Sequence, residues 1–157
     1  ANKKALIFDI LSSLLKDKAI VCSDFSYEDV SLQQFFKFTD YRNSVLAGGN
    51  GTPGYGFPAA IGASFSRPRS KIVSISSGIN FQFSMQEMIV AKEQDIDLSI
   101  VVLNESNQNK GQKSPDYKLM GESFGVQSFK IKTDSNLKKN LRKYLNHKGL
   151  RLIEIII

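Results

Sequence analysis

A buried apolar run, a Ser-Ser-Gly turn and an amphipathic segment follow one another in the middle of the chain. The run "KIVSIS" (71–76) predicts a strand, and helical periodicity predicts a helix over residues 80–94. In α/β proteins, anions and metals bind at such strand-to-helix turns. This turn carries Ser77 and Gly78, and no acidic residue follows until Glu87. It therefore has the form of a phosphate or metal site without the carboxylate that a metal favours.

A second candidate is the loop "GGNGTPGYG" at residues 48–56, whose five glycines and one proline exclude regular structure. Its "GNGTPG" (49–54) matches the dinucleotide motif G-x-G-x-x-G letter for letter. That motif requires a preceding strand and an acidic residue about 20 positions later. Here the preceding "SVLA" is short, Pro53 lacks a backbone N–H, and the following strand ends without Asp or Glu. The loop is therefore not expected to bind a nicotinamide or flavin cofactor.

The elements that position both turns alternate between strand and helix. Near-continuous apolar strands alternating with helices predict a three-layer α/β/α sandwich with a mainly parallel sheet of five or six strands. The expected strands are 19–23, 71–76, 98–103, 128–131 and 150–157. The expected helices are 3–16, 28–38, 58–65, 80–94, 115–124 and 134–147.

Composition fits one globular domain of 157 residues, 41% hydrophobic, with no apolar run long enough to span a membrane. The lone Cys22 lies in an apolar run, and a buried reduced thiol without a signal peptide predicts a cytoplasmic protein. The lone His147 has no partners at metal-ligand spacing. The chain starts directly on a helix and stops on "EIII", so we expect residues 1–157 to be a single domain excised from a longer chain.

The net charge of +6 is concentrated between Lys130 and Arg151. In that segment Leu137, Leu141 and Leu145 fall on one helical face, which places the lysines on the opposite one. The favoured interpretation is a solvated helix surface. Nucleic-acid binding is the alternative, and it is disfavoured because no aromatic residues are interleaved with the basic ones.

The longer stretch "AGGNGTPGYGFPAAIGASFSRP" closely resembles the G-G-G-T-M-G-Y-G-L-P-A-A-I-G-A segment of acetolactate synthases, which depend on thiamine diphosphate. "INFQFSMQEM" resembles the helix after their G-D-G-S turn, and "IVVLNE" resembles their strand ending in Asn-Asn. "AIVCSDFSYEDVSLQQFFKF" resembles their diphosphate-contacting strand and helix, and "SPDYKLMGESFGV" resembles N-P-D-F-x-x-L-A-x-A-F-G. The resemblance covers nearly the whole chain in order.

This resemblance implies the C-terminal, diphosphate-binding domain of such an enzyme, which carries thiamine diphosphate and Mg²⁺. A pyrimidine-binding domain from a neighbouring subunit would supply the activating Glu, so the implied partner is that domain or a homo-oligomer. Aromatic residues in "LQQFFKF" (32–38) would form an exposed patch at the interface. The equivalent cofactor positions are Tyr27, Glu28, Gly51, Thr52, Pro53, Ser77, Gly78, Ile79 and Asn80. The equivalent metal positions are Gly78, Glu105 and Asn107.

Several of these positions depart from the family pattern. Gly78 stands at the metal-binding Asp and has no side chain, and Glu105 replaces the second Asn. Asn107 falls where the family uses a backbone carbonyl. Pro53 replaces a Met whose N–H bonds the cofactor, and Tyr27-Glu28 replace Gln-His at the diphosphate.

The segment from Glu105 to Ser114 is also much too short for the family's mobile substrate loop. These departures predict a non-catalytic pseudoenzyme domain that serves assembly or regulation, with weak or absent cofactor binding. The alternative is a working acetolactate synthase or 2-oxoacid decarboxylase with a divergent site.

Overall fold

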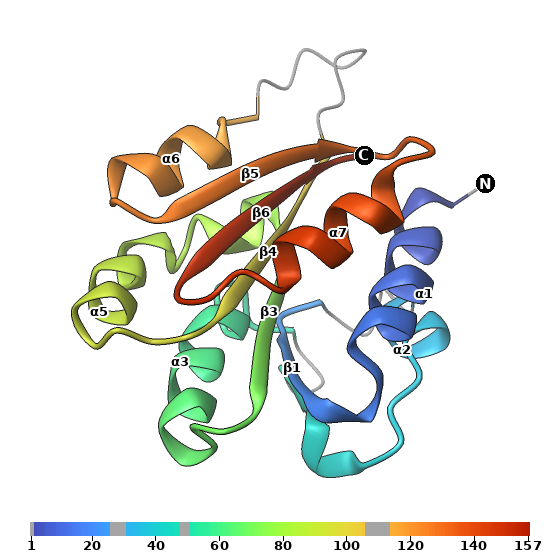
Figure 1. Cartoon of the computed structure of the whole chain (residues 1–157), viewed down its shortest axis with the longest axis horizontal. Coiled ribbons are helices and arrows are strands. Elements are labelled where there is room, and N and C mark those ends of the chain that lie inside the picture. Colours follow the sequence, from blue (N-terminus) through green and yellow to red (C-terminus); the bar gives the residue numbers. More distant parts are fainter. Residues whose placement is uncertain (1, 26–30, 48–50, 106–113) are drawn as a thin grey trace.

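The computed structural model contains one six-stranded sheet in which every paired strand is parallel, in the order β2-β1-β3-β4-β6-β5 (Figure 1). It describes residues 2–25, 31–47, 51–105 and 114–157. This confirms the expected α/β fold and its parallel sheet. The strands are β1 Ala19–Ser23, β2 Ser44–Leu46, β3 Lys71–Ser77, β4 Ser99–Asn104, β5 Gln127–Lys132 and β6 Arg151–Ile156.

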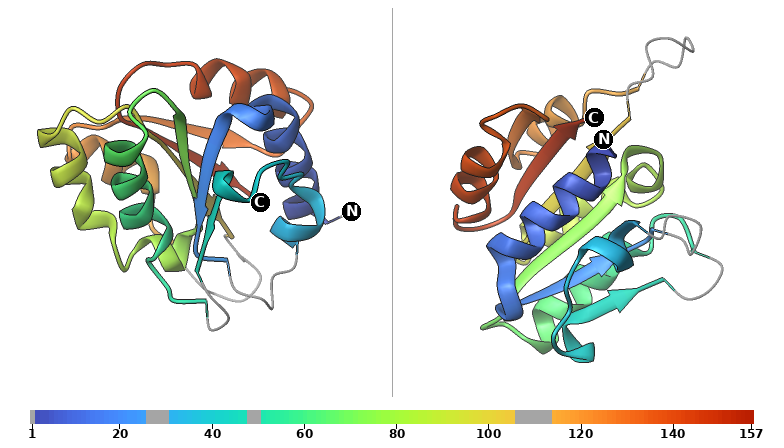
Figure 2. Two further views of the ribbon diagram at one scale, coloured as in Figure 1. Left: turned by 90° about the horizontal axis from the view of Figure 1, so that it is seen from below. Right: turned by 90° about the vertical axis from the view of Figure 1, so that its right-hand side faces the viewer.

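Helices cover both faces of the sheet, as the two further views make plain (Figure 2). One face packs against α1, α2 and α7, and the other against α3, α4, α5 and α6. The helices are α1 Lys3–Leu15, α2 Ser31–Phe35, α3 Gly56–Ser66, α4 Gly78–Phe81, α5 Met88–Glu93, α6 Tyr117–Ser123 and α7 Leu137–Leu145. Short 3₁₀ turns are η1 Lys16–Lys18, η2 Tyr41–Asn43 and η3 Met85–Glu87.

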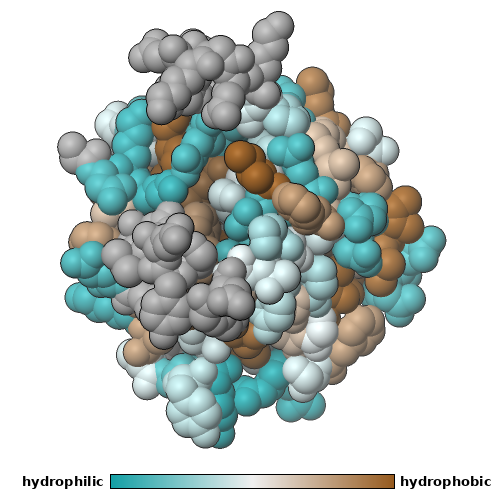
Figure 3. Space-filling model, turned by 180° about the vertical axis from the view of Figure 1, so that it is seen from behind, coloured by the Kyte–Doolittle hydropathy of each residue, from teal (hydrophilic) through white to brown (hydrophobic). Residues whose placement is uncertain are grey.

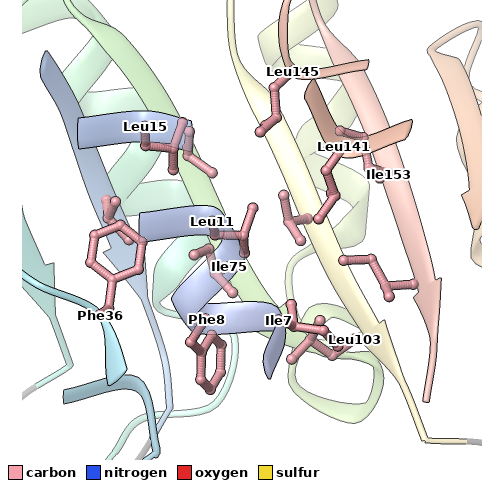
Figure 4. Packing of buried hydrophobic residues seen from close by; sticks show 14 of the residues in the cluster. Ile7, Phe8, Leu11, Leu15, Phe36, Ile75, Leu103, Leu141, Leu145 and Ile153 are labelled. Carbon is pink, nitrogen blue, oxygen red and sulfur yellow. The ribbon is translucent and has the colours of Figure 1, made fainter. Parts of the chain in front are cut away.

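The strands bury both faces because alternate side chains enter two separate cores. In β3, Val73 and Ile75 join the core under α1 and α7, whereas Ile72 joins the core under α3 and α5. Figure 4 shows the first core, where side chains of α1 and α7 converge on the sheet. In the second core the thiol of Cys22 is fully buried, and this burial raises its pKa to about 12. Cys22 is therefore a free, buried thiol, as expected.

The helix expected over residues 80–94 is interrupted. Bonds from Phe83 N–H to the Asn80 carbonyl (3.1 Å) and from Ser84 N–H to the Phe81 carbonyl (3.1 Å) tighten the chain after α4. Such i→i+3 bonds end an α-helix, and the helix resumes only at η3 and α5. The short edge strand β2 was also not expected from the sequence.

The predicted aromatic patch at residues 32–38 is wrong. Leu32 and Phe36 are buried, at 1% and 4% exposure, in the core beside α1, and Phe35 and Phe38 are partly buried against the same core. The segment turns inward because α2 is the layer that covers this end of the sheet next to α1. These rings therefore stabilise the domain and do not form an exposed interface.

The basic segment forms an amphipathic helix, as expected. Leu137, Leu141 and Leu145 of α7 are buried, and Lys138 and Lys139 face solvent. Seen from behind, apolar residues lie in small groups among polar ones (Figure 3), as on an ordinary protein surface. None of the helices in the described residues has the length and apolar character needed to cross a bilayer.

Candidate cofactor site at the carboxyl edge of the sheet

The turn after β3 is built by Ser77 and Gly78. The Ser77 hydroxyl accepts a hydrogen bond from the Asn80 N–H (3.2 Å) and thereby caps α4, whose first residue is Gly78. Ile79 points into solvent, with 67% of its surface exposed. The four predicted positions of this turn therefore lie together where the strands end, but their polar groups are used to fix the turn itself.

The glycine loop lies directly beside this turn. Gly51 and Gly54 have positive φ angles of 51° and 79°, and the Tyr55 N–H bonds to the Thr52 carbonyl (3.2 Å). A Cβ atom on Gly54 would lie 2.7 Å from Cβ of Phe83, so only glycine allows this approach. Pro53, like Thr52, is exposed at the tip of the loop. The structure thus brings the predicted positions 51–53 and 77–80 together at one edge.

A carboxylate that was not among the predicted site residues joins the two segments. Asp24 follows β1 and is completely buried, and its Oδ2 accepts hydrogen bonds from the Gly54 N–H (3.2 Å) and the Ser76 hydroxyl (3.2 Å). The Asn80 amide also donates to Asp24, at 3.3 Å to its carbonyl and 3.4 Å to Oδ1. Burial raises the pKa of Asp24, and these donors oppose that rise. An acid placed directly after a buried strand was the available sequence signal.

The space beside Gly78 is filled by an aromatic ring. A Cβ atom on Gly78 would lie 2.6 Å from Oη, 2.7 Å from Cε2 and 2.8 Å from Cζ of Tyr117. The Tyr117 side chain is fully buried, its hydroxyl accepts a hydrogen bond from the Gln82 amide (2.8 Å), and its ring packs edge-on against Phe81. The ring is therefore held in place on several sides. It occupies the volume into which a side chain at position 78 would extend.

The polar residues at the end of β4 are bonded to other groups of the protein. Glu105 forms an ion pair with Lys4 of α1 (2.5 Å). The amide of the preceding Asn104 donates to the buried Glu154 (2.6 Å) and to the Pro115 carbonyl (3.2 Å). Over the described part of the chain, no three His, Cys, Asp or Glu side chains are grouped so that they could hold a metal ion. The predicted positions Tyr27, Glu28 and Asn107 lie outside the described residues.

The fold is that of a class of thiamine-diphosphate-binding domains. The family model described as "Thiamine pyrophosphate enzyme, C-terminal TPP binding domain" matches residues 28–109, more than half of the chain. Thiamine pyrophosphate is another name for thiamine diphosphate. The chain belongs to this family of C-terminal domains, and it is a distant homologue of acetolactate synthases.

The relatives are distant in sequence and much longer than this chain. The mitochondrial acetolactate synthase of Schizosaccharomyces pombe is 26% identical over 95% of this chain and 25% of its own length. The probable acetolactate synthase large subunit of Methanocaldococcus jannaschii is 29% identical over 96% of this chain and 28% of its own. A structure of a putative thiamin diphosphate-dependent enzyme from Mycobacterium smegmatis has the same fold, with a TM-score of 0.78 at 20% identity over 97% of this chain and 31% of that one. The chain spans about a quarter of the length of its curated relatives.

Proposed function

We propose that this domain keeps the architecture of its family but does not hold thiamine diphosphate and Mg²⁺ in the family manner. It would serve as a non-catalytic domain in assembly or regulation. The observation that carries the proposal is the contact between Gly78 and Tyr117. Position 78 lacks a metal-binding side chain, and the buried phenol occupies the space that such a side chain would need.

The other described positions support the same conclusion. Glu105 forms an ion pair with Lys4, and the Asn80 amide is directed at Asp24. Asp24 accepts hydrogen bonds from the protein on both carboxylate oxygens and is buried, so it offers no free carboxylate oxygen to a cation. The residues present therefore do not fit the family's metal set of hard oxygen donors.

The glycine loop gives a separate reason to expect weak or absent cofactor binding. Pro53 has no backbone N–H to donate to an aminopyrimidine ring. A buried acceptor left without its donor costs about 1–3 kcal/mol. Glu28 would add a negative charge at the position where the resemblance places the cofactor's diphosphate. The barrier to binding is thus spread over several positions, and restoring one of them would not remove it.

For partners, we propose a pyrimidine-binding domain or a second copy of the chain. Tyr55, Ile79 and Phe83 are large apolar side chains near the glycine loop and the β3–α4 turn, and all three are exposed. A docking domain at this edge would remove them from water. The relatives are about four times as long as this chain, which supports a longer protein that contains residues 1–157 as one domain. A cytoplasmic location stays a prediction.

Calorimetric titration of thiamine diphosphate with Mg²⁺ into the full-length protein tests the proposed function. We expect no binding heat at micromolar ligand concentrations and an unchanged unfolding midpoint. A ligand at 100 times its dissociation constant would instead add about 2.7 kcal/mol of stability. A thiamine-diphosphate-dependent acetolactate synthase serves as the positive control for the reagents. Mg²⁺-dependent binding at micromolar affinity would contradict the proposal and favour a working enzyme with a divergent site.

A further inference from the structure

A basic hollow lies at the opposite, amino edge of the sheet, between the start of β3, the start of β6 and the end of α7. Its volume is about 300 Å³. The cations that line it are Arg69, Lys71, Lys148 and Arg151, and Asp97 is the one carboxylate among its described lining residues. The hollow is formed by segments far apart in the sequence, which the parallel sheet brings to one edge (Figure 1).

Three of the four cations form no ion pair with a carboxylate in the described part of the chain. Arg151 is buried and pairs with Asp97 as well as with the carbonyl of Leu145 (3.2 Å) at the end of α7. The Lys71 amine donates to the neutral Asn146 amide (3.1 Å). Arg69 and Lys148 make no hydrogen bond or ion pair within the described residues. Helix capping therefore accounts for Arg151 but leaves the other three charges unexplained.

The positive charge around this hollow affects the pKa of one of its own lysines. Burial lowers the pKa of Lys71, repulsion from the nearby Arg151 lowers it further, and attraction to Asp97 opposes both effects without cancelling them. An anion between these groups would relieve that repulsion. The cations also converge on one concavity instead of forming an extended track, which favours a small ligand over nucleic acid.

A second hollow, also of about 300 Å³, adjoins the first. The two share Pro68, Ser70 and Asp97 in their linings. Its apolar lining consists of Phe65 and Pro68 and of the largely buried Ile72 and Ile96. Its polar lining includes Gln94, Arg67 and the carboxylate Asp95. A basic compartment beside a partly apolar one is the arrangement that a charged group attached to an organic body would fill.

We propose that the two hollows form a binding site for a small phosphorylated ligand. Its phosphate would lie among Arg69, Lys71 and Lys148, and its organic part would contact Phe65 and Pro68 in the adjoining hollow. A phosphate monoester carries nearly two negative charges at neutral pH and three strong acceptor oxygens, which suits three cations without carboxylate partners. This site does not depend on the proposed loss of thiamine diphosphate at the other edge.

Titration calorimetry of the full-length protein with inorganic phosphate, adenosine 5′-monophosphate and adenosine tests the inference. We expect both phosphates to bind, the nucleotide more tightly, and adenosine alone not to bind. In the variant Arg69→Gln/Lys71→Met the affinity for both phosphates should fall by about tenfold or more, the effect of losing roughly one charge-assisted contact. The Met side chain at position 71 keeps the apolar part of the half-buried lysine, which protects folding.

The matched control is Lys138→Gln/Lys139→Met, which removes the same charge from the exposed face of α7. Its affinity for the phosphates should stay within about twofold of wild type, because distant surface charges are screened by salt. Equal losses in both variants would overturn the proposal in favour of diffuse attraction. No binding of either phosphate to the wild type, or tighter binding of a single-stranded oligonucleotide than of the nucleotide, would also overturn it.

Discussion

The variant Gly78→Ala will be less stable than wild type by about 1–3 kcal/mol, because its new methyl group has no room. The methyl carbon would lie 2.6 Å from the Tyr117 hydroxyl and under 3 Å from two ring carbons. The backbone at Gly78 does not have a positive φ, so the cost comes from the tyrosine ring and not from backbone strain. Gly78→Asp, which restores the family's metal-binding residue, should cost at least as much. Urea unfolding at constant pH measures both.

Gly62→Ala is the control for glycine replacement as such. Gly62 lies inside α3, and a Cβ atom there would meet nothing within 4 Å. That variant should be more stable than wild type by about 0.5–1 kcal/mol, since alanine favours a helix. In a double-mutant cycle, the cost of Gly78→Ala should largely disappear in a Tyr117→Leu background, where the ring is gone. A Gly78→Ala protein as stable as wild type would show that Tyr117 does not block this position.

Much of the fold could be predicted because its signals are local. The apolar run of residues 19–23 defines β1 to the residue, and Pro58 lies in the first turn of α3 as its fixed φ favours. The exposed patch expected at residues 32–38 failed because composition does not show which neighbour covers an apolar segment. Leu32 and Phe36 look the same in sequence whether they face α1 or solvent.

At the site, the sequence located the two turns but did not identify Tyr117 and Asp24 as the side chains that pack beside them. The contact between Gly78 and Tyr117 joins residues 39 positions apart and depends on where α6 packs. The tyrosine at the family's phenylalanine position did not reveal this contact, because the close approach involves ring carbons as well as the hydroxyl and depends on where the ring packs. Asp24 was overlooked because its partners, Gly54 and Ser76, approach it only after β1 and β3 have paired.

The variant Asp24→Ala will lose about 3 kcal/mol or more of its free energy of unfolding. Its carboxylate accepts hydrogen bonds from the Gly54 N–H, the Ser76 hydroxyl and the Asn80 amide in a site without solvent access. Buried donors left without an acceptor cost about 1–3 kcal/mol each. The loss would also release the glycine loop from the turn after β3, because Asp24 is bonded to both segments. Asp9→Ala, at an exposed position of α1, is the control and should change stability little.

Asp24→Asn separates the charge of this group from its shape. The asparagine keeps one acceptor oxygen but turns an NH₂ group toward donors, so it should be less stable than wild type by about 1–2 kcal/mol. Because burial raises the pKa of Asp24 above 3.8, the folded state binds this proton more tightly than the unfolded state. Its contribution to stability is therefore full at low pH and declines as pH rises through the folded-state pKa. The deficit of Asp24→Asn should accordingly be larger at about pH 4 than at about pH 7. Urea unfolding of both proteins at the two pH values measures it, and a deficit that grows with pH would contradict the raised pKa.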